Sequence, residues 1–213
     1  MLSSVRLIPI NAPPMKEGET VIDFKLIYTG PLPSASRFGR VEEKHRIRQD
    51  IHRQLRYFWE NYSPDRYLSE ALGFTIGAEA IATRFRINGY RFVPLVREEH
   101  VASVAVDILF MRRDKPGRIV SGGGDIDNRL KTLFDALRMP IDGHQLPPDS
   151  SPSEGEDPFF VLLQDDSLIT DIRVTTSPLL EPAGEQNNVH LVIGVSIVPS
   201  LASFSETIQK RGA

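Results

Sequence analysis

Hydrophobic and polar positions alternate with two different periods along the chain, so they predict a mixture of strands and helices. Residues 21–30, VIDFKLIYTG, alternate with the period of two that is typical of a strand. Residues 41–62 carry apolar side chains at three- and four-residue steps, which predicts an amphipathic helix. Residues 101–113 are apolar on both faces and therefore predict a central strand.

A hairpin is predicted over residues 84–93, RFRINGYRFV, because the Asn-Gly pair at 88–89 favours a type I′ turn. This register pairs Arg86 with Arg91 and places Arg84 on the same face. Two like charges on opposite strands are unfavourable unless an acid or an anion lies between them. A nucleic-acid phosphate and a nearby glutamate of the same chain satisfy this requirement equally well.

The C-terminal half completes the predicted fold. An apolar stripe over residues 126–137 indicates a second main helix, residues 159–177 predict two β segments interrupted at Asp165-Asp166, and residues 187–199 predict a last strand. We expect an α/β (α+β) fold in which a mixed sheet of about five or six strands packs with two main helices.

The length predicts one domain over residues 1–213. We interpret the region around 63–100, which holds the hairpin, as an insertion attached to this domain. A second insertion, at about 139–158, is rich in proline, serine and acid and is expected to be a mobile surface excursion.

Composition narrows the class of protein. The chain is 40% hydrophobic and 25% charged, which is typical of a soluble globular protein. It has no cysteine, and this excludes disulfides, thiolate catalysis and iron–sulfur clusters. We see no signal peptide, and the longest apolar-rich stretch, 189–198, is too short to span a bilayer. These features predict a cytoplasmic protein without a membrane partner.

Charge is distributed unevenly along a chain whose net charge is −3. Residues 37–58 carry seven basic and three acidic residues, and residues 84–97 carry four basic residues and no acid. Residues 139–190 carry ten acids and a single arginine. This separation permits a local positive surface on an acidic protein, although charge runs of this kind are more often solvated faces. His45 and His52, two turns apart, are expected to be solvated.

The sequence DIDNRLKTLFDAL, residues 125–137, raises a specific chemical question. Asp127, Lys131 and Asp135 follow one another at four-residue steps on the predicted helix, where Asp127 can cap the helix or pair with Lys131. Asp135 is expected to be a salt-bridge partner. Asp125 has no such local role, because a second carboxylate so close to Asp127 only adds repulsion.

A matching acidic pair, Asp165-Asp166, follows later in the chain. If its two flanking β segments lie beside the helix N-terminus, three or four carboxylates converge there and require a cation. Hard oxygen ligands without sulfur select Mg²⁺, with Mn²⁺ as an alternative. Lys131, one turn along the helix, is placed to neutralise a phosphate oxygen.

These motifs resemble the RusA-like Holliday junction resolvases. That family carries D-[LI]-D-N-x-x-K-x-x-x-D-A-L at a helix start, followed by D-D-[SA]-x-[IV], and here the motifs read DIDNRLKTLFDAL at 125–137 and DDSLI at 165–169. The similarity covers about residues 22–60 and 101–198. It implies a compact mixed α/β homodimer that nicks four-way DNA junctions symmetrically as a Mg²⁺-dependent endonuclease.

The resemblance also implies roles for individual residues. It implies that the catalytic residues are Asp125, Asp127, Lys131 and Asp166. It implies that the metal ligands are Asp125, Asp127, Asp165 and Asp166. The candidate DNA-binding residues are Arg37, Arg40, Arg46, Arg84, Arg86, Arg91 and Arg129. Two alternatives stay open: a non-catalytic nucleic-acid-binding or interaction protein of this type, and a nuclease for other branched DNA.

Overall fold

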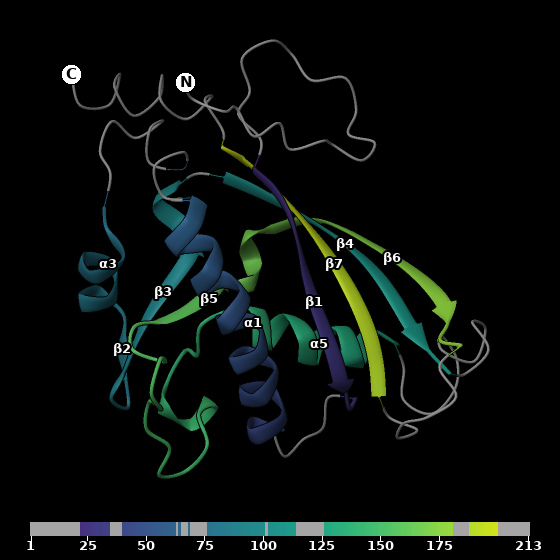
Figure 1. Cartoon of the computed structure of the whole chain (residues 1–213), viewed down its shortest axis with the longest axis horizontal. Coiled ribbons are helices and arrows are strands. Elements are labelled where there is room, and N and C mark those ends of the chain that lie inside the picture. Colours follow the sequence, from purple (N-terminus) through teal and green to yellow (C-terminus); the bar gives the residue numbers. More distant parts are fainter. Residues whose placement is uncertain are drawn as a thin grey trace.

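The computed structural model describes residues 22–34, 40–62, 64, 68, 76–100, 102–113, 126–180 and 188–199. Within these ranges the chain forms seven strands, three α-helices and three short 3₁₀ helices (Figure 1). The strands are β1 (Ile22–Pro31), β2 (Arg86–Ile87), β3 (Tyr90–Val96), β4 (Ala102–Arg112), β5 (Phe159–Leu163), β6 (Ile169–Pro178) and β7 (Asn188–Pro199). The α-helices are α1 (Val41–Tyr62), α3 (Ala78–Arg84) and α5 (Ile126–Leu137), and the 3₁₀ helices are η1 (Glu98–His100), η2 (Gly143–Gln145) and η3 (Asp166–Leu168).

Four strands form the larger sheet in the order β1-β7-β4-β6 (Figure 1). β7 runs antiparallel to both β1 and β4, whereas β4 and β6 are parallel. The strands that the sequence predicts at 21–30, 101–113 and 187–199 are confirmed as β1, β4 and β7. The predicted interruption at Asp165-Asp166 is also confirmed, since η3 separates β5 from β6.

The remaining strands form a second sheet in the order β2-β3-β5, so the expected single sheet of five or six strands is wrong. The predicted hairpin register is confirmed, with Arg86 opposite Arg91. The expected place of Arg84 on the hairpin is wrong, because Arg84 is the last residue of α3. β3 continues beyond the hairpin and pairs in parallel with β5, where Phe92 lies opposite Phe159. The hairpin therefore belongs to a buried sheet, and α3 beside it is a helix that the apolar pattern did not predict.

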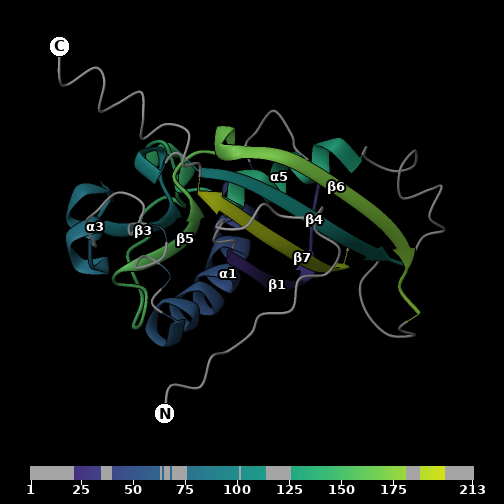
Figure 2. The ribbon, with the colours of Figure 1, turned by 90° about the horizontal axis from the view of Figure 1, so that it is seen from above.

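The two long helices cover the same face of the larger sheet. Ile51 and Leu55 of α1 join Leu133 and Leu137 of α5 in one buried cluster with the inward side chains of β1, β4 and β7. Figure 2 shows the four strands of this sheet edge to edge. This packing confirms the general α+β class and both predicted main helices. None of the helices within the described residues is long and apolar enough to cross a lipid bilayer.

Residues 139–158 differ from the mobile excursion that their composition predicts. The carbonyl of Gly155 accepts hydrogen bonds from His52 and Arg56 of α1, and Glu156 accepts one from Gln49. Glu156 is itself buried. Several hydrogen bonds thus hold the second insertion against α1, and they come from polar positions that an apolar pattern does not report.

The two histidines of α1 are buried, contrary to the expectation that they are solvated. His52 accepts a hydrogen bond at Nδ1 from the Phe160 amide, so its Nε2–H is the donor to Gly155. His45 Nε2 lies 3.4 Å from the Tyr90 hydroxyl. Burial lowers the pKa of His45 to about 4 and also lowers the pKa of His52. Both imidazoles therefore belong to the core as neutral groups.

Candidate metal and nucleic-acid site

The start of α5 presents two uncommitted charges to solvent. Asp127 is exposed in the first turn, and its Oδ1 accepts the amide hydrogen of Asn128 at 2.8 Å. Lys131, one turn later, is also exposed, and among the described residues neither Asp127 nor Lys131 makes an ion pair. The Asp127–Lys131 salt bridge that the spacing permits is therefore not formed. The positive end of the helix dipole favours an ionised carboxylate here. Asp125 lies outside the described residues.

The second acidic position is formed by η3 and the residue before it. Asp165 caps η3 by accepting the Ser167 amide at 3.0 Å. Hydrogen bonds from Ser167, with the nearby Arg138 guanidinium, hold the pKa of the Asp165 carboxyl below its usual value. The side chain of Asp166 is 47% exposed, and its Oδ1 lies 3.6 Å from Arg138 Nε. Both carboxylates could accept a cation, but the one beside them in the structure is the Arg138 guanidinium.

These two positions lie at opposite ends of α5. Arg129, close to Asp127, donates to the carbonyl of Leu32, just beyond the end of β1. Arg138, immediately after the last turn of the helix, contacts Asp166. Arg138 follows Arg129 by nine positions, which corresponds to roughly 14 Å along the helix axis. The segment at 165–166 therefore lies beside the end of α5, not beside its N-terminus as the sequence led us to expect.

The sheet register gives the same arrangement. Ile169, which follows η3, pairs with Val104 near the start of β4, whereas Pro31 at the end of β1 pairs with Asn188. The latter pair lies level with the far end of β4, nine strand residues or roughly 30 Å away. Within the described ranges, no three His, Asp or Glu side chains lie close enough together to hold a metal ion. A complete metal site is not formed by the described residues of a single chain.

Asp135, the third aspartate of the motif, links the two long helices. Its Oδ2 lies 2.7 Å from Lys44 Nζ on α1, and its Oδ1 lies 3.2 Å from a terminal nitrogen of Arg138. The buried Arg48 guanidinium donates to the carbonyls of both Asp135 and Arg138. The prediction that Asp135 is a salt-bridge partner is confirmed. Lys44 was not identifiable as its partner, because the contact joins residues far apart in sequence.

Acids of the same chain neutralise Arg91 of the hairpin and Arg84, the last residue of α3. Arg91 is bonded to both Asp157 and Glu79, at 2.7 Å each. Arg84 makes two hydrogen bonds to the carboxylate of Glu99, at 3.0 and 2.7 Å. Hydrogen bonds from Arg84 and then Arg97 lower the pKa of Glu99 to about 2. The sequence left open whether a nucleic-acid phosphate or an acid of the same chain neutralises the hairpin. For Arg91, the fold supplies carboxylates of the same chain.

The candidate DNA-binding arginines therefore differ in availability. Arg129 is buried against Leu32, and this burial removes it from any DNA-facing surface. Arg40 pairs with Glu43. Arg46 and Arg86 are exposed and make no ion pair within the described structure. Arg37 lies outside the described residues. Two of the seven proposed positions, Arg46 and Arg86, thus present an unpaired guanidinium.

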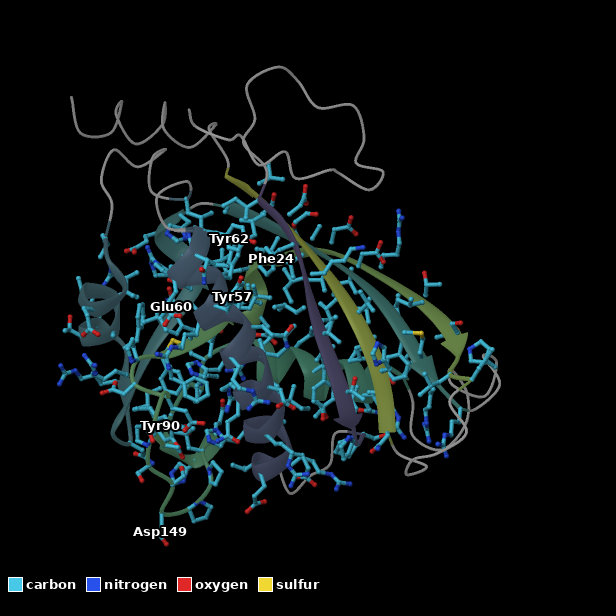
Figure 3. The ribbon with its side chains drawn as sticks, viewed as in Figure 1. Phe24, Tyr57, Glu60, Tyr62, Tyr90 and Asp149 are labelled. Carbon is cyan, nitrogen blue, oxygen red and sulfur yellow. The ribbon has the colours of Figure 1, made fainter. Side chains whose placement is uncertain are left out.

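Exposed aromatic side chains at the C-terminal end of α1 escaped the sequence analysis. Tyr57 and Tyr62 are 60% and 45% exposed. Tyr62 packs on Phe58, which in turn stacks on Phe24 of β1 with ring centroids 4.6 Å apart. Figure 3 shows Phe24, Tyr57 and Tyr62 near this end of the helix and Tyr90 farther along it. Tyr62 fits the apolar spacing of α1, so the spacing alone predicted a core residue.

Neither the models of protein families, nor the curated proteins, nor the solved structures gave a match to this chain.

Proposed function

We propose that this protein is a Mg²⁺-dependent endonuclease acting on branched DNA, with four-way junctions as the favoured substrate. The proposal extends the motif resemblance to the RusA-like resolvases. The observation that carries it is the start of α5, where Asp127 and Lys131 are both exposed and uncommitted although their spacing allows a salt bridge. Both charges are therefore free to meet a metal ion and a phosphate.

The residues present fit a divalent metal in part. Asp127 offers a hard carboxylate oxygen, and Asp125, two residues earlier in the sequence, is the proposed second ligand. A Mg²⁺ ion held there would polarise a phosphodiester and lower the pKa of a bound water. The role of Lys131 is to place a positive charge against a phosphate oxygen. Asp165 and Asp166 join this chemistry only in an assembly that brings the two acidic positions together.

DNA binding is assigned to the unpaired arginines. Among the described candidate residues, Arg46 and Arg86 have exposed guanidinium groups available for backbone phosphates, so binding should weaken as salt rises. The acids around Arg91 work against a more extensive DNA-binding surface on the hairpin. A homodimer would present two equivalent sites to a four-way junction, which is itself nearly two-fold symmetric.

A non-catalytic DNA-binding role is the second candidate. The separation of Asp127 from Asp166 within one chain favours it, because a shared metal ion needs both groups nearby. Such a protein would bind branched DNA in the presence of chelator and would keep this binding after Asp127→Asn.

Cleavage of synthetic DNA tests the proposal. Four-way, forked and linear duplexes of the same sequence are incubated with the protein in Mg²⁺ or in chelator. Paired nicks in the four-way junction that need Mg²⁺ are expected, and Asp127→Asn should remove them. Cleavage of forks alone would keep the chemistry and change the substrate. Binding without cleavage in any metal would replace the proposal with the second candidate.

A further inference from the structure

The larger sheet has two edge strands, β1 and β6, and the fold covers only the first of them with a helix. Gln54 of α1 accepts a hydrogen bond from the Ile27 amide at 2.9 Å and donates one to the Ile27 carbonyl at 2.7 Å. The Tyr28 hydroxyl donates to the carbonyl of Pro31, at the end of the same strand. Side chains thus occupy main-chain groups of β1 that an edge strand would otherwise offer to another strand.

The edge of β6 has no comparable cover among the described residues. β6 pairs in parallel with β4, and no described strand pairs with its other side, at the margin of the sheet away from α1 (Figure 1). After a register shift beside Val104, the ladder is regular from Asp171 to Pro178. Alternate residues of a parallel edge strand point their N–H and C=O groups away from the neighbouring strand. These groups of β6 are therefore available to an added strand.

Residues 171–177 of β6 also lack the features that usually protect an edge strand. The segment contains no proline and no bulge. Ile172 and Val174 lie opposite core residues of β4, so their side chains point to the side of the sheet that carries the helices, and no charged residue of the segment points there. Ile172 is nevertheless 47% exposed. A long, regular edge with an exposed aliphatic side chain is the kind that pairs with another chain.

The charges beside this edge leave one acid without a partner. Arg173 lies directly opposite Asp107 of β4, so these two charges offset each other. Asp171 lies opposite Ala105, is exposed, and makes no ion pair among the described residues. The edge is therefore slightly negative. This sign favours a basic occupant and argues against the phosphate backbone of a nucleic acid.

We propose that the free edge of β6 binds an extended segment of a partner protein in which aliphatic and basic side chains alternate. Successive side chains of a strand point to opposite faces, so one set lies beside Ile172 and Val174 and the other beside Asp171. Aliphatic side chains of the first set cover the exposed part of Ile172, and a lysine or arginine of the second set pairs with Asp171. Main-chain hydrogen bonds supply affinity, and the two sets of side chains supply selectivity.

The charge balance favours such a segment over a second copy of β6. Each copy brings Asp107, Asp171 and Arg173 to the contact, so two copies bring together two surfaces with the same negative sign. A basic segment instead neutralises Asp171. The inference does not rest on the proposed nuclease, because it concerns protein binding at a strand that holds none of the proposed catalytic residues.

Binding of a synthetic peptide tests the inference. The fluorescein-labelled nonapeptide TVKVTVKVT is titrated with the full chain and followed by fluorescence anisotropy, and saturable binding is expected. Two further versions are N-methylated, one on every valine and the other on every residue between the valines. One version should lose binding and the other should keep it, because a strand pairs with its neighbour through alternate residues. Equal behaviour of the two versions, or no saturable binding of the unmethylated peptide, would overturn the inference.

Two substitutions locate the peptide on the chain. Ile172→Asp places a charge on the core-facing side of the edge and should weaken binding about tenfold or more. Ile27→Asp is the matched control, because Ile27 is 51% exposed on the edge strand that Gln54 covers. This control should bind the peptide as the wild type does. Loss of binding in both variants, or in neither, would contradict a site at β6.

Charge exchange and sedimentation test the chemistry of the occupant. Asp171→Lys should weaken binding of TVKVTVKVT and strengthen binding of TVEVTVEVT, in which glutamate replaces lysine. An unchanged preference for the lysine peptide would contradict the role of Asp171. Sedimentation equilibrium should give the same association state for the wild type and Ile172→Asp. A wild-type dimer that Ile172→Asp converts into a monomer would assign the edge to a second copy and overturn the inference.

Discussion

Arg138 Nε lies 3.6 Å from Asp166 Oδ1, so the second acidic position is held at the C-terminal end of the helix whose start carries Asp127. The two acidic motifs therefore lie at opposite ends of α5 and do not meet at one point. In the isolated chain, a metal ion at Asp127 is out of reach of Asp166. This relationship separates metal binding from cleavage in a way that can be measured.

Asp166→Asn should affect cleavage and leave metal binding almost unchanged. Without DNA, Asp166 is remote from Asp127, so the affinity of the protein for Mg²⁺ should stay within about threefold of wild type. With a four-way junction, cleavage should fall by about a hundredfold or more, because the resemblance gives this carboxylate a catalytic role. Calorimetry and a single-turnover cleavage assay measure the two quantities. An equal loss of Mg²⁺ affinity would mean that the acidic positions already meet in the free protein.

Asp135→Asn should act on stability and not on chemistry. The substitution removes the counter-charge of Lys44 and the nearer of the two carboxylates beside Arg138, and both cations are mostly buried. We expect the free energy of unfolding to fall by about 2 kcal/mol. Urea denaturation measures this change, and the folded variant should cleave at the wild-type rate.

Asp50→Asn is the matched control for that substitution. It breaks the ion pair of Asp50 with Arg53, whose side chain is 69% exposed, and should cost only about 0.5 kcal/mol. Equal costs for the two variants would show that Asp135 has no special role in joining α1 to α5.

Arg86 of the hairpin and Arg84 at the end of α3 should behave differently. Arg86 is exposed and unpaired, so Arg86→Glu should weaken junction binding about fivefold and reduce its salt dependence. Arg84→Glu instead places a carboxylate against Glu99 and should lower the melting temperature with little effect on binding. Fluorescence anisotropy over a range of salt concentrations, with thermal melting alongside, separates the two effects. Equal binding losses would show that the Arg84–Glu99 pair opens to reach DNA.

Stability should fall in mild acid because three histidines are buried as neutral groups. Burial lowers the pKa of His45 to about 4 and that of His100 to about 3, and it lowers the pKa of His52 as well. The unfolded chain binds protons on these groups near pH 6.5, before the folded chain does. The stability present above pH 6.5 should therefore be lost progressively as the pH falls towards 4.

Chemical denaturation between pH 7.5 and 4 measures this dependence. His45→Gln should flatten the decline, and His144→Gln, on an exposed histidine, should leave it unchanged. A decline that His45→Gln does not alter would assign the acid sensitivity to other groups.

Local pattern was sufficient for most individual elements and insufficient for their long-range arrangement. The period of two in 21–30, the Asn-Gly turn at 88–89 and the apolar stripe of 126–137 act over a few residues, and each predicted its element correctly. The pairing of β3 with β5 joins segments nearly seventy residues apart, and nothing in either strand specifies the partner. This contact is what divides the expected single sheet into two.

At the candidate site, too, local features were predictable from the sequence and long-range contacts were not. The exposed, first-turn position of Asp127 followed from the motif and the helix period. The position of Asp166 depended on the route of the chain through residues 139–158, which pack on α1 through His52 and Glu156. Those contacts are polar and long-range, so a hydrophobic pattern cannot report them. The same holds for Glu99 and Asp157, the acids that neutralise Arg84 and Arg91.

Calorimetric titration of Mg²⁺ into the wild type, Asp127→Asn and Asp171→Asn tests the central claim most directly. Asp171 is an exposed aspartate of β6 outside both motifs, so its variant loses the same charge at an unrelated place. We predict saturable Mg²⁺ binding to the wild type and to Asp171→Asn, and at least a tenfold loss of affinity in Asp127→Asn. Identical isotherms for the wild type and Asp127→Asn would contradict a metal site at the start of α5, and with it the proposed nuclease.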